Sequence, residues 1–125
     1  MENRSLAEAN YASFITKALA GGKVYGLQDR DGAWAVCPSL RNPDTDVIVF
    51  WSDRSSAKFH VKEEWTSHRV GEIGLDLFVG VWLRGMHEDG YFVGPDWDDN
   101  LEGLEIEAIE VAKRLTEEND QKAVE

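Results

Sequence analysis

DVIVFW, residues 46–51, is the stretch that indicates the fold class most directly. Its β-branched and aromatic side chains follow one another without a turn residue, which is typical of a buried central strand. Upstream, KVYGLQ (residues 23–28) and AWAVC (residues 33–37) flank DRDG (residues 29–32), whose Asp-Gly ending is a strong hairpin signal. The sequence therefore predicts a hairpin of two antiparallel strands that is followed by the central strand.

Apolar residues at helical spacing predict helices around these strands. The expected helices cover residues 5–20, 53–64, 75–86 and 105–120, with weaker strands at residues 68–74 and 91–94. Their start signals are a capping box of Ser5 with Glu8, then Ser52 or Asp53, then Asp76. In the last helix, Glu110 and Arg114 have the order that favours an i,i+4 ion pair.

The order of these elements predicts an α+β fold with a small, mostly antiparallel sheet and three to four helices. With 125 residues the chain has the usual length of one domain. We therefore expect a single domain over residues 1–125, with an ordered core over about residues 5–118 and a frayed tail at residues 119–125.

The charge of the chain is negative and concentrated near one end. The 24 Asp and Glu residues against 13 Lys and Arg residues give a formal net charge of -11. Residues 96–125 contribute 11 acidic and 3 basic side chains to this total. Such a charge repels phosphate backbones and anionic membrane surfaces, so neither nucleic acid nor a membrane is an expected partner.

Cysteine content and hydropathy indicate the compartment. Cys37 is the single cysteine, so an internal disulfide or a multi-cysteine metal site is excluded. The most apolar stretch, residues 75–83, is far shorter than the roughly 20 residues of a membrane span. The first ten residues carry charges of both signs and no apolar run of a secretory signal. We expect a cytoplasmic protein.

Four local patterns give the chain a family resemblance. They are V-Y-x-L-x-D-x-D-G at residues 24–32, F-W-S at residues 50–52, V-G-x-x-W-D at residues 93–98 and L-x-G-L-E at residues 101–105. Over residues 11–115 the chain resembles an uncharacterised bacterial family catalogued as domain of unknown function number 2750. This resemblance implies no activity, cofactor or site residue. Pro95 departs from the small polar residue expected there.

The acidic segment at residues 96–107, DWDDNLEGLEIE, partly matches a calcium-binding loop. Oxygen ligands would come from Asp96, Asp98, Asn100 and Glu107 at the required spacing. However, a leucine stands at the position where the loop needs glycine, and Gly103 stands where it needs an apolar residue. The favoured interpretation is a capped turn with solvated carboxylates, and no metal or other cofactor is expected.

Trp97 lies between Asp96, Asp98 and Asp99 and suggests an interaction surface. An exposed loop tryptophan is a good binding anchor, although the ring could equally fold back over the sheet edge. With Glu102 and Glu105, the aspartates would steer a basic protein partner toward this surface. The first hypothesis is thus a non-enzymatic, cytoplasmic interaction module, an immunity-like inhibitor or a regulator.

The alternative hypothesis is a small-molecule-binding domain or minor enzyme with an aromatic-lined cleft. Trp51, Trp97, Tyr25 and His68 would line the cleft, and Asp98 would supply a carboxylate. The sequence contains no G-x-S-x-G nucleophile motif, no phosphate-binding glycine loop and no paired histidines at metal-ligand spacing. The position of the Trp97 ring distinguishes the two hypotheses best.

Overall fold

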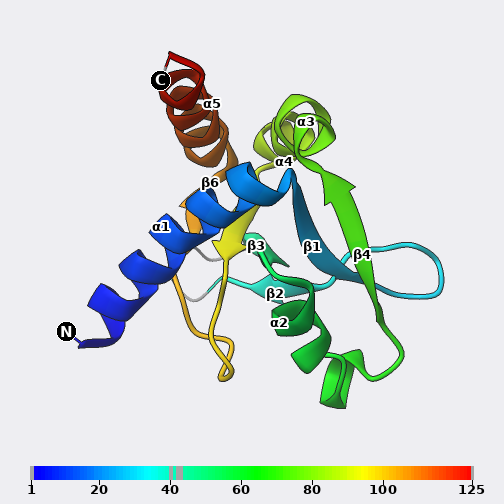
Figure 1. Cartoon of the computed structure of the whole chain (residues 1–125). Helices are drawn as coiled ribbons and strands as arrows, with labels where there is room; N and C mark the ends of the chain where they lie inside the picture. The colour runs from blue at the N-terminus through cyan, green and yellow to red at the C-terminus, as the bar shows by residue number, and fades with distance from the viewer. Residues whose placement is uncertain (1, 40, 42–43, 125) are drawn as a thin grey trace.

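The predicted central strand is β3 (Asp46–Phe50), which lies inside a four-stranded sheet with the order β2-β3-β5-β6. Strand β2 (Val36–Pro38) and strand β6 (Ile106–Glu107) pair antiparallel with their neighbours, whereas β3 and β5 (Phe92–Pro95) run parallel. The computed structural model shown in Figure 1 describes residues 2–39, 41 and 44–124. It confirms an α+β fold with mostly antiparallel strands.

The predicted hairpin between residues 23–28 and 33–37 forms only next to its turn, where the Asp29 N–H donates to the Ala33 carbonyl and the Ala35 N–H donates to the Leu27 carbonyl. The longer pairing of β1 (Lys23–Gln28) is with another strand. All six residues of β1 pair antiparallel with β4 (Arg69–Gly74), and the two strands form a second sheet. Near the DRDG turn, the ladder is reduced to an isolated bridge between Gln28 and Trp34. The turn itself forms, because the Asp29 carboxylate accepts hydrogen bonds from the backbone N–H groups of Asp31 and Ala33.

Backbone pairing along the second edge of β1 gives the physical reason for the short hairpin. Tyr25 of β1 exchanges backbone hydrogen bonds with Trp51, so the chain that returns from the turn leaves β1 after Ala35 and joins the edge of β3. The indole of Trp34 then covers the β1–β4 sheet over two glycines. A Cβ atom on Gly26 would lie 2.7 Å from the ring, and one on Gly71 would lie 2.8 Å from it.

The expected helices form, with corrections at their ends. The first two are α1 (Glu2–Gly21) and α2 (Arg54–Phe59), and the short 3-10 helix η1 (Glu63–Trp65) follows α2. The third expected helix is a continuous segment made of α3 (Leu75–Leu77), the π-helical turn η2 (Phe78–Trp82) and α4 (Leu83–Asp89). The last is α5 (Ala108–Val124). Helix α1 begins upstream of the expected start at Ser5, whose side chain lies outside the described part of the chain. The expected capping role of Asp76 is wrong, because Gly74 is the cap residue.

The second helix ends earlier than the expected residue 64. Asp53 caps α2, since its carboxylate accepts the backbone N–H of Ser56. After Phe59 the chain becomes extended at Lys62 (φ -163°) and left-handed at Glu63 (φ 54°), which no α-helix can accommodate. This break turns the segment between α2 and β4 into a loop that carries η1 and lines the candidate site.

Strand β3 separates two hydrophobic clusters, which explains its uninterrupted apolar sequence. Ile48 and Phe50 point into the cluster with α1, α4 and α5, where Phe50 contacts Phe78 edge to face at 4.9 Å between ring centroids. Val47, Val49 and Trp51 point into the opposite cluster. The members of this second cluster also include Leu27, Ala35, Ala57, Trp65 and Trp97.

Helix α5 packs its expected apolar stripe on the core through Ala108, Val111 and Leu115. The expected pair of Glu110 with Arg114 is wrong, because the Arg114 guanidinium donates to Glu118, with an N···O distance of 2.7 Å. The helix continues to Val124, and the expectations for the domain boundaries and a frayed tail stay predictions. Among the described residues, no helix is both long enough and apolar enough to cross a bilayer.

Candidate binding pocket

Trp97 is folded back into the protein instead of projecting from the loop. Its side chain is 8% exposed, and its ring N–H donates to the Leu104 carbonyl at 2.8 Å. The ring fits against two glycines, since added Cβ atoms would lie 2.6 Å from it at Gly94 and 2.3 Å from it at Gly103. The expectation of an exposed Trp97 anchor is therefore wrong, and the alternative of a ring that covers the sheet edge holds.

Trp51 connects this loop to the strand below it. Its side chain is 1% exposed, and its ring N–H donates to the Trp97 carbonyl at 3.0 Å. On its other side the indole stacks on the imidazole of His60, with 4.9 Å between ring centroids and an interplanar angle of 21°. Trp51 is thus the support of His60 and is not itself a contact surface.

The acidic side chains that match a calcium-binding loop in the sequence have other places in the structure. Asp96 accepts the backbone N–H of Ser52 at 2.7 Å and the Ser52 hydroxyl at 2.6 Å. Asp98 accepts the backbone N–H groups of Asn100 and Glu102. Glu107 belongs to β6. Within the described chain, no three side chains of metal-binding type converge.

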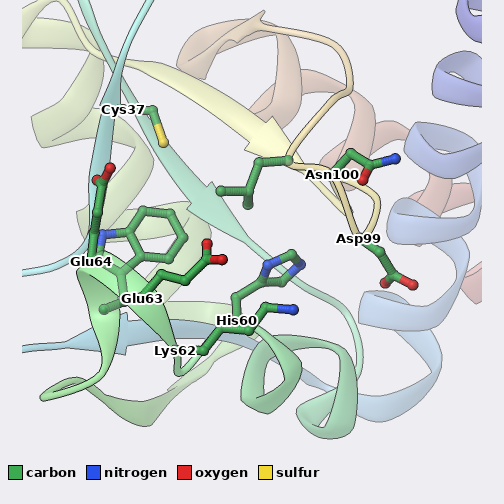
Figure 2. Close-up of a pocket in the computed structure, with 9 residues that line it drawn as sticks. Cys37, His60, Lys62, Glu63, Glu64, Asp99 and Asn100 are labelled. Carbon is green, nitrogen blue, oxygen red and sulfur yellow. The ribbon is translucent and has the colours of Figure 1, made fainter.

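A pocket of about 410 Å³ opens beside His60, and we call it the His60 pocket. This volume is in the range of pockets that bind small ligands or single side chains. Three separate segments form it. They contribute Cys37 from β2, His60, Lys62, Glu63, Glu64 and Trp65 from the α2–β4 connection, and Asp99, Asn100 and Leu101 from the acidic loop. Figure 2 shows Cys37 and Asp99 at opposite ends, with Glu63 and His60 between them.

The charges around the His60 pocket do not neutralise one another. Its carboxylates belong to Glu63, Glu64 and Asp99, and none of them takes part in a salt bridge in the part of the chain that the structure describes. The Lys62 ammonium instead lies 3.7 Å from the centroid of the Phe59 ring. The pocket is therefore an acidic hollow with an imidazole at its base.

His60 and Cys37 have perturbed acidities. Burial lowers the pKa of His60 below 6.5, while the carboxylates of Asp99 and Asp98 oppose this shift and Lys62 adds to it. Burial, with the nearby Glu64 charge, raises the pKa of the Cys37 thiol above its ordinary value. A raised thiol pKa is typical of an unreactive cysteine, because reactive cysteines are held as thiolates by a lowered pKa.

The remaining predicted site residues lie around the edges of this region. Glu102 is exposed, and Glu105 accepts a hydrogen bond from the Ser39 hydroxyl. A second hollow between α1 and the acidic loop is lined by Trp51, Trp97 and Asp98, which were expected in one cleft. Tyr25 and His68, expected in the same cleft, line neither this hollow nor the His60 pocket.

Sequence reasoning missed His60, Glu63 and Glu64 as pocket residues. They are ordinary helical positions if the second helix is taken to continue to residue 64. The signal that could have found them is weak, since neither Lys62 nor Glu63 is a residue type that usually stops a helix. Only the tertiary structure brings this connection next to residues 99–101.

The lowered pKa of buried His60 should make the free energy of unfolding depend on pH. Because its folded pKa lies below 6.5, the unfolded chain binds this proton more tightly. The resulting contribution to stability is complete above pH 6.5 and is lost as the pH falls through the lowered pKa, with a slope of at most about 1.4 kcal/mol per pH unit. Urea titrations at several pH values should show a smaller acid loss in His60→Gln than in the unaltered chain. Equal losses in both would contradict the assignment to His60.

The comparisons with known proteins give a family and no activity. A family model described as "Protein of unknown function (DUF2750)" matches residues 11–115, which is most of the chain. A search of curated proteins gave no match. The matched range includes the His60 pocket and the whole acidic loop.

Proposed function

The chain belongs to the DUF2750 family of proteins of unknown function, and we propose that it is a non-enzymatic interaction module whose His60 pocket receives a positively charged side chain of a basic protein partner. The observation that carries this proposal is the set of three carboxylates around the pocket, none of which has a salt-bridge partner among the described residues. A guanidinium or ammonium group would supply the missing positive charge and donate hydrogen bonds to them.

The distribution of charge supports a basic macromolecular partner. The net charge of -11 creates a negative field around the molecule, and Asp99 of the pocket belongs to its most acidic region, residues 96–125. Such a field raises the rate of association with a positive surface and makes that rate sensitive to salt. Inhibition or regulation of the partner in the cytoplasm is the role that we propose for the module. The same negative charge disfavours nucleic acid as a partner.

The proposal predicts binding of a defined probe, the acetylated and amidated peptide Gly-Gly-Arg-Gly-Gly, which we call the single-arginine peptide. The combined variant Glu63→Gln, Glu64→Gln and Asp99→Asn should weaken this binding by about tenfold, because charge-assisted hydrogen bonds are lost. Isothermal titration calorimetry at low salt measures the affinity. A peptide with citrulline in place of arginine keeps the shape without the charge and should not bind.

A second variant controls for net charge. Asp31→Asn, Glu88→Gln and Glu117→Gln remove the same number of charges at exposed positions that do not line the pocket. This control should reduce the affinity only slightly. Equal weakening in both variants, or equal binding of the citrulline peptide, would contradict a pocket that recognises a cation.

A small cationic molecule is the second candidate ligand, and the aromatic lining of the pocket favours it. Trp65 is 9% exposed and lines the pocket together with the stacked His60 ring. These rings can contact a flat cation without any contribution from a peptide backbone. Methylguanidinium separates the two functions, because a small-molecule site should bind it as tightly as the single-arginine peptide, whereas a protein-interaction site should bind it more weakly.

A further inference from the structure

The second hollow lies directly beside the His60 pocket, on the side of helix α1. It has a volume of about 490 Å³, and we call it the α1 hollow. One wall consists of Leu6, Asn10, Ser13 and Lys17, which follow one another at helical spacing along α1. The opposite wall is the acidic loop, residues 96–100. Figure 2 shows Asp99 and Asn100 on the side of the loop next to helix α1, which is drawn in faint blue.

The two hollows share part of their lining. His60, Asp99 and Asn100 line both of them. His60 is 4% exposed, so it is a buried polar residue at the junction of the two hollows. We call the two adjoining hollows together the groove, which extends from Cys37 of β2 to helix α1.

The α1 hollow is acidic as well, and Asp99 is the carboxylate that it shares with the His60 pocket. Asp96 and Asp98 also line it, while their carboxylates accept the internal hydrogen bonds described above. The cation of the hollow is Lys17, which no salt bridge joins to these carboxylates among the described residues. At the rim, Leu6 is 54% exposed and offers an apolar contact that a simple ion would not use. Each half of the groove is therefore suited to one cationic side chain, and the rim is suited to a chain that connects them.

We infer that the groove binds an extended peptide segment with two basic side chains, one in the His60 pocket and one in the α1 hollow. This inference rests on the proposed function, and it specifies the partner as a linear basic segment instead of a folded surface. The backbone of the segment would cross the loop at Asp99 and Asn100, which line both halves.

The test compares the single-arginine peptide with acetylated, amidated peptides in which two arginines are separated by zero to four glycines. At the spacing that matches the groove, a second arginine should tighten binding by about tenfold or more, because its binding is intramolecular once the first is held. Calorimetry at one salt concentration measures both peptides on the full chain.

Three substitutions on α1 test where the second arginine binds. Asn10→Lys adds a positive charge to the α1 hollow and should bring the two-arginine peptide down to single-arginine affinity. Thr16→Lys adds the same charge at an exposed position of α1 outside the groove, and it should leave the gain intact. Lys17→Gln removes the cation of the hollow and should tighten the two-arginine peptide while leaving the single-arginine peptide unchanged.

The outcomes separate this inference from the proposed function. If the single-arginine peptide does not bind, the proposed function fails together with the inference. If it binds but no spacing improves the affinity, the linear two-site partner is wrong and the single pocket stands. Equal effects of Asn10→Lys and Thr16→Lys would also overturn the inference, because they would show a general charge effect and no second site.

Discussion

Replacing Gly103 with alanine is expected to lower the free energy of unfolding by about 3 kcal/mol, the upper range for an overpacked interior. The added Cβ atom would lie 2.3 Å from the Trp97 ring, well inside contact distance. The ring cannot move away easily, because Gly94 lies against it and its N–H is bonded to the Leu104 carbonyl. Urea unfolding followed by far-ultraviolet circular dichroism measures the loss.

The Trp97 ring is the cause of this expected loss, and a double substitution can show it. In a Trp97→Leu background the added methyl group has room, so Gly103→Ala should cost much less there than in the unaltered chain. Gly21→Ala is the matched control, because no atom lies within 4 Å of a Cβ atom placed there and its φ is not left-handed. Similar losses from Gly103→Ala in both backgrounds would show that the backbone at Gly103, and not the indole, resists the substitution.

Elements with a strong local signal were predictable from the sequence. Strand β3 has side chains buried on both faces, so its apolar run is uninterrupted and visible without any knowledge of its neighbours. The apolar stripes of α1 and α5 are visible for a similar reason, since Phe14, Val111 and Leu115 face one core. In each case the spacing of apolar residues within one segment shows which side chains are buried.

Pairing between distant segments was not predictable in the same way. The Asp-Gly turn was recognised, but β1 pairs mainly with β4, where Gly26 and Gly71 lie opposite each other and make room for the Trp34 ring. Gly71 is 45 positions further along the chain than Gly26, so no local pattern connects them. The early end of α2 has the same origin, because a left-handed Glu63 is stabilised only by its surroundings.

The candidate site was found only in part. The acidic loop was identified correctly as a region of high charge, yet the individual roles differ from the expected ones. Trp97 is a core residue, and Asp96 and Asp98 hold the loop through bonds to Ser52 and to backbone N–H groups. Charge density in a sequence shows where carboxylates are, and only the fold shows which of them, such as Asp99, are left to face a pocket.

Trp51→Ala is the second substitution with a large expected effect, about 3–5 kcal/mol of lost unfolding free energy, as for other fully buried aromatic side chains. Trp51 lies where three parts of the molecule meet. Its backbone exchanges hydrogen bonds of 2.7 and 2.8 Å with Tyr25, which joins the two sheets. Its side chain holds the Trp97 carbonyl on one side and stacks on His60 on the other.

Trp51→Phe separates the contributions of packing and hydrogen bonding. Phenylalanine keeps most of the apolar contact and the stack beneath His60, but the Trp97 carbonyl loses its donor, which should cost about 1–3 kcal/mol. The single-arginine peptide should still bind this variant, because its proposed ligands are Glu63, Glu64 and Asp99, and the lost N–H group donates to Trp97 and to none of them. If Trp51→Phe is as unstable as Trp51→Ala, the hydrogen bond outweighs the packing. If it is stable but does not bind the peptide, the indole acts in the pocket directly, and the role of Trp51 as a support of His60 is wrong.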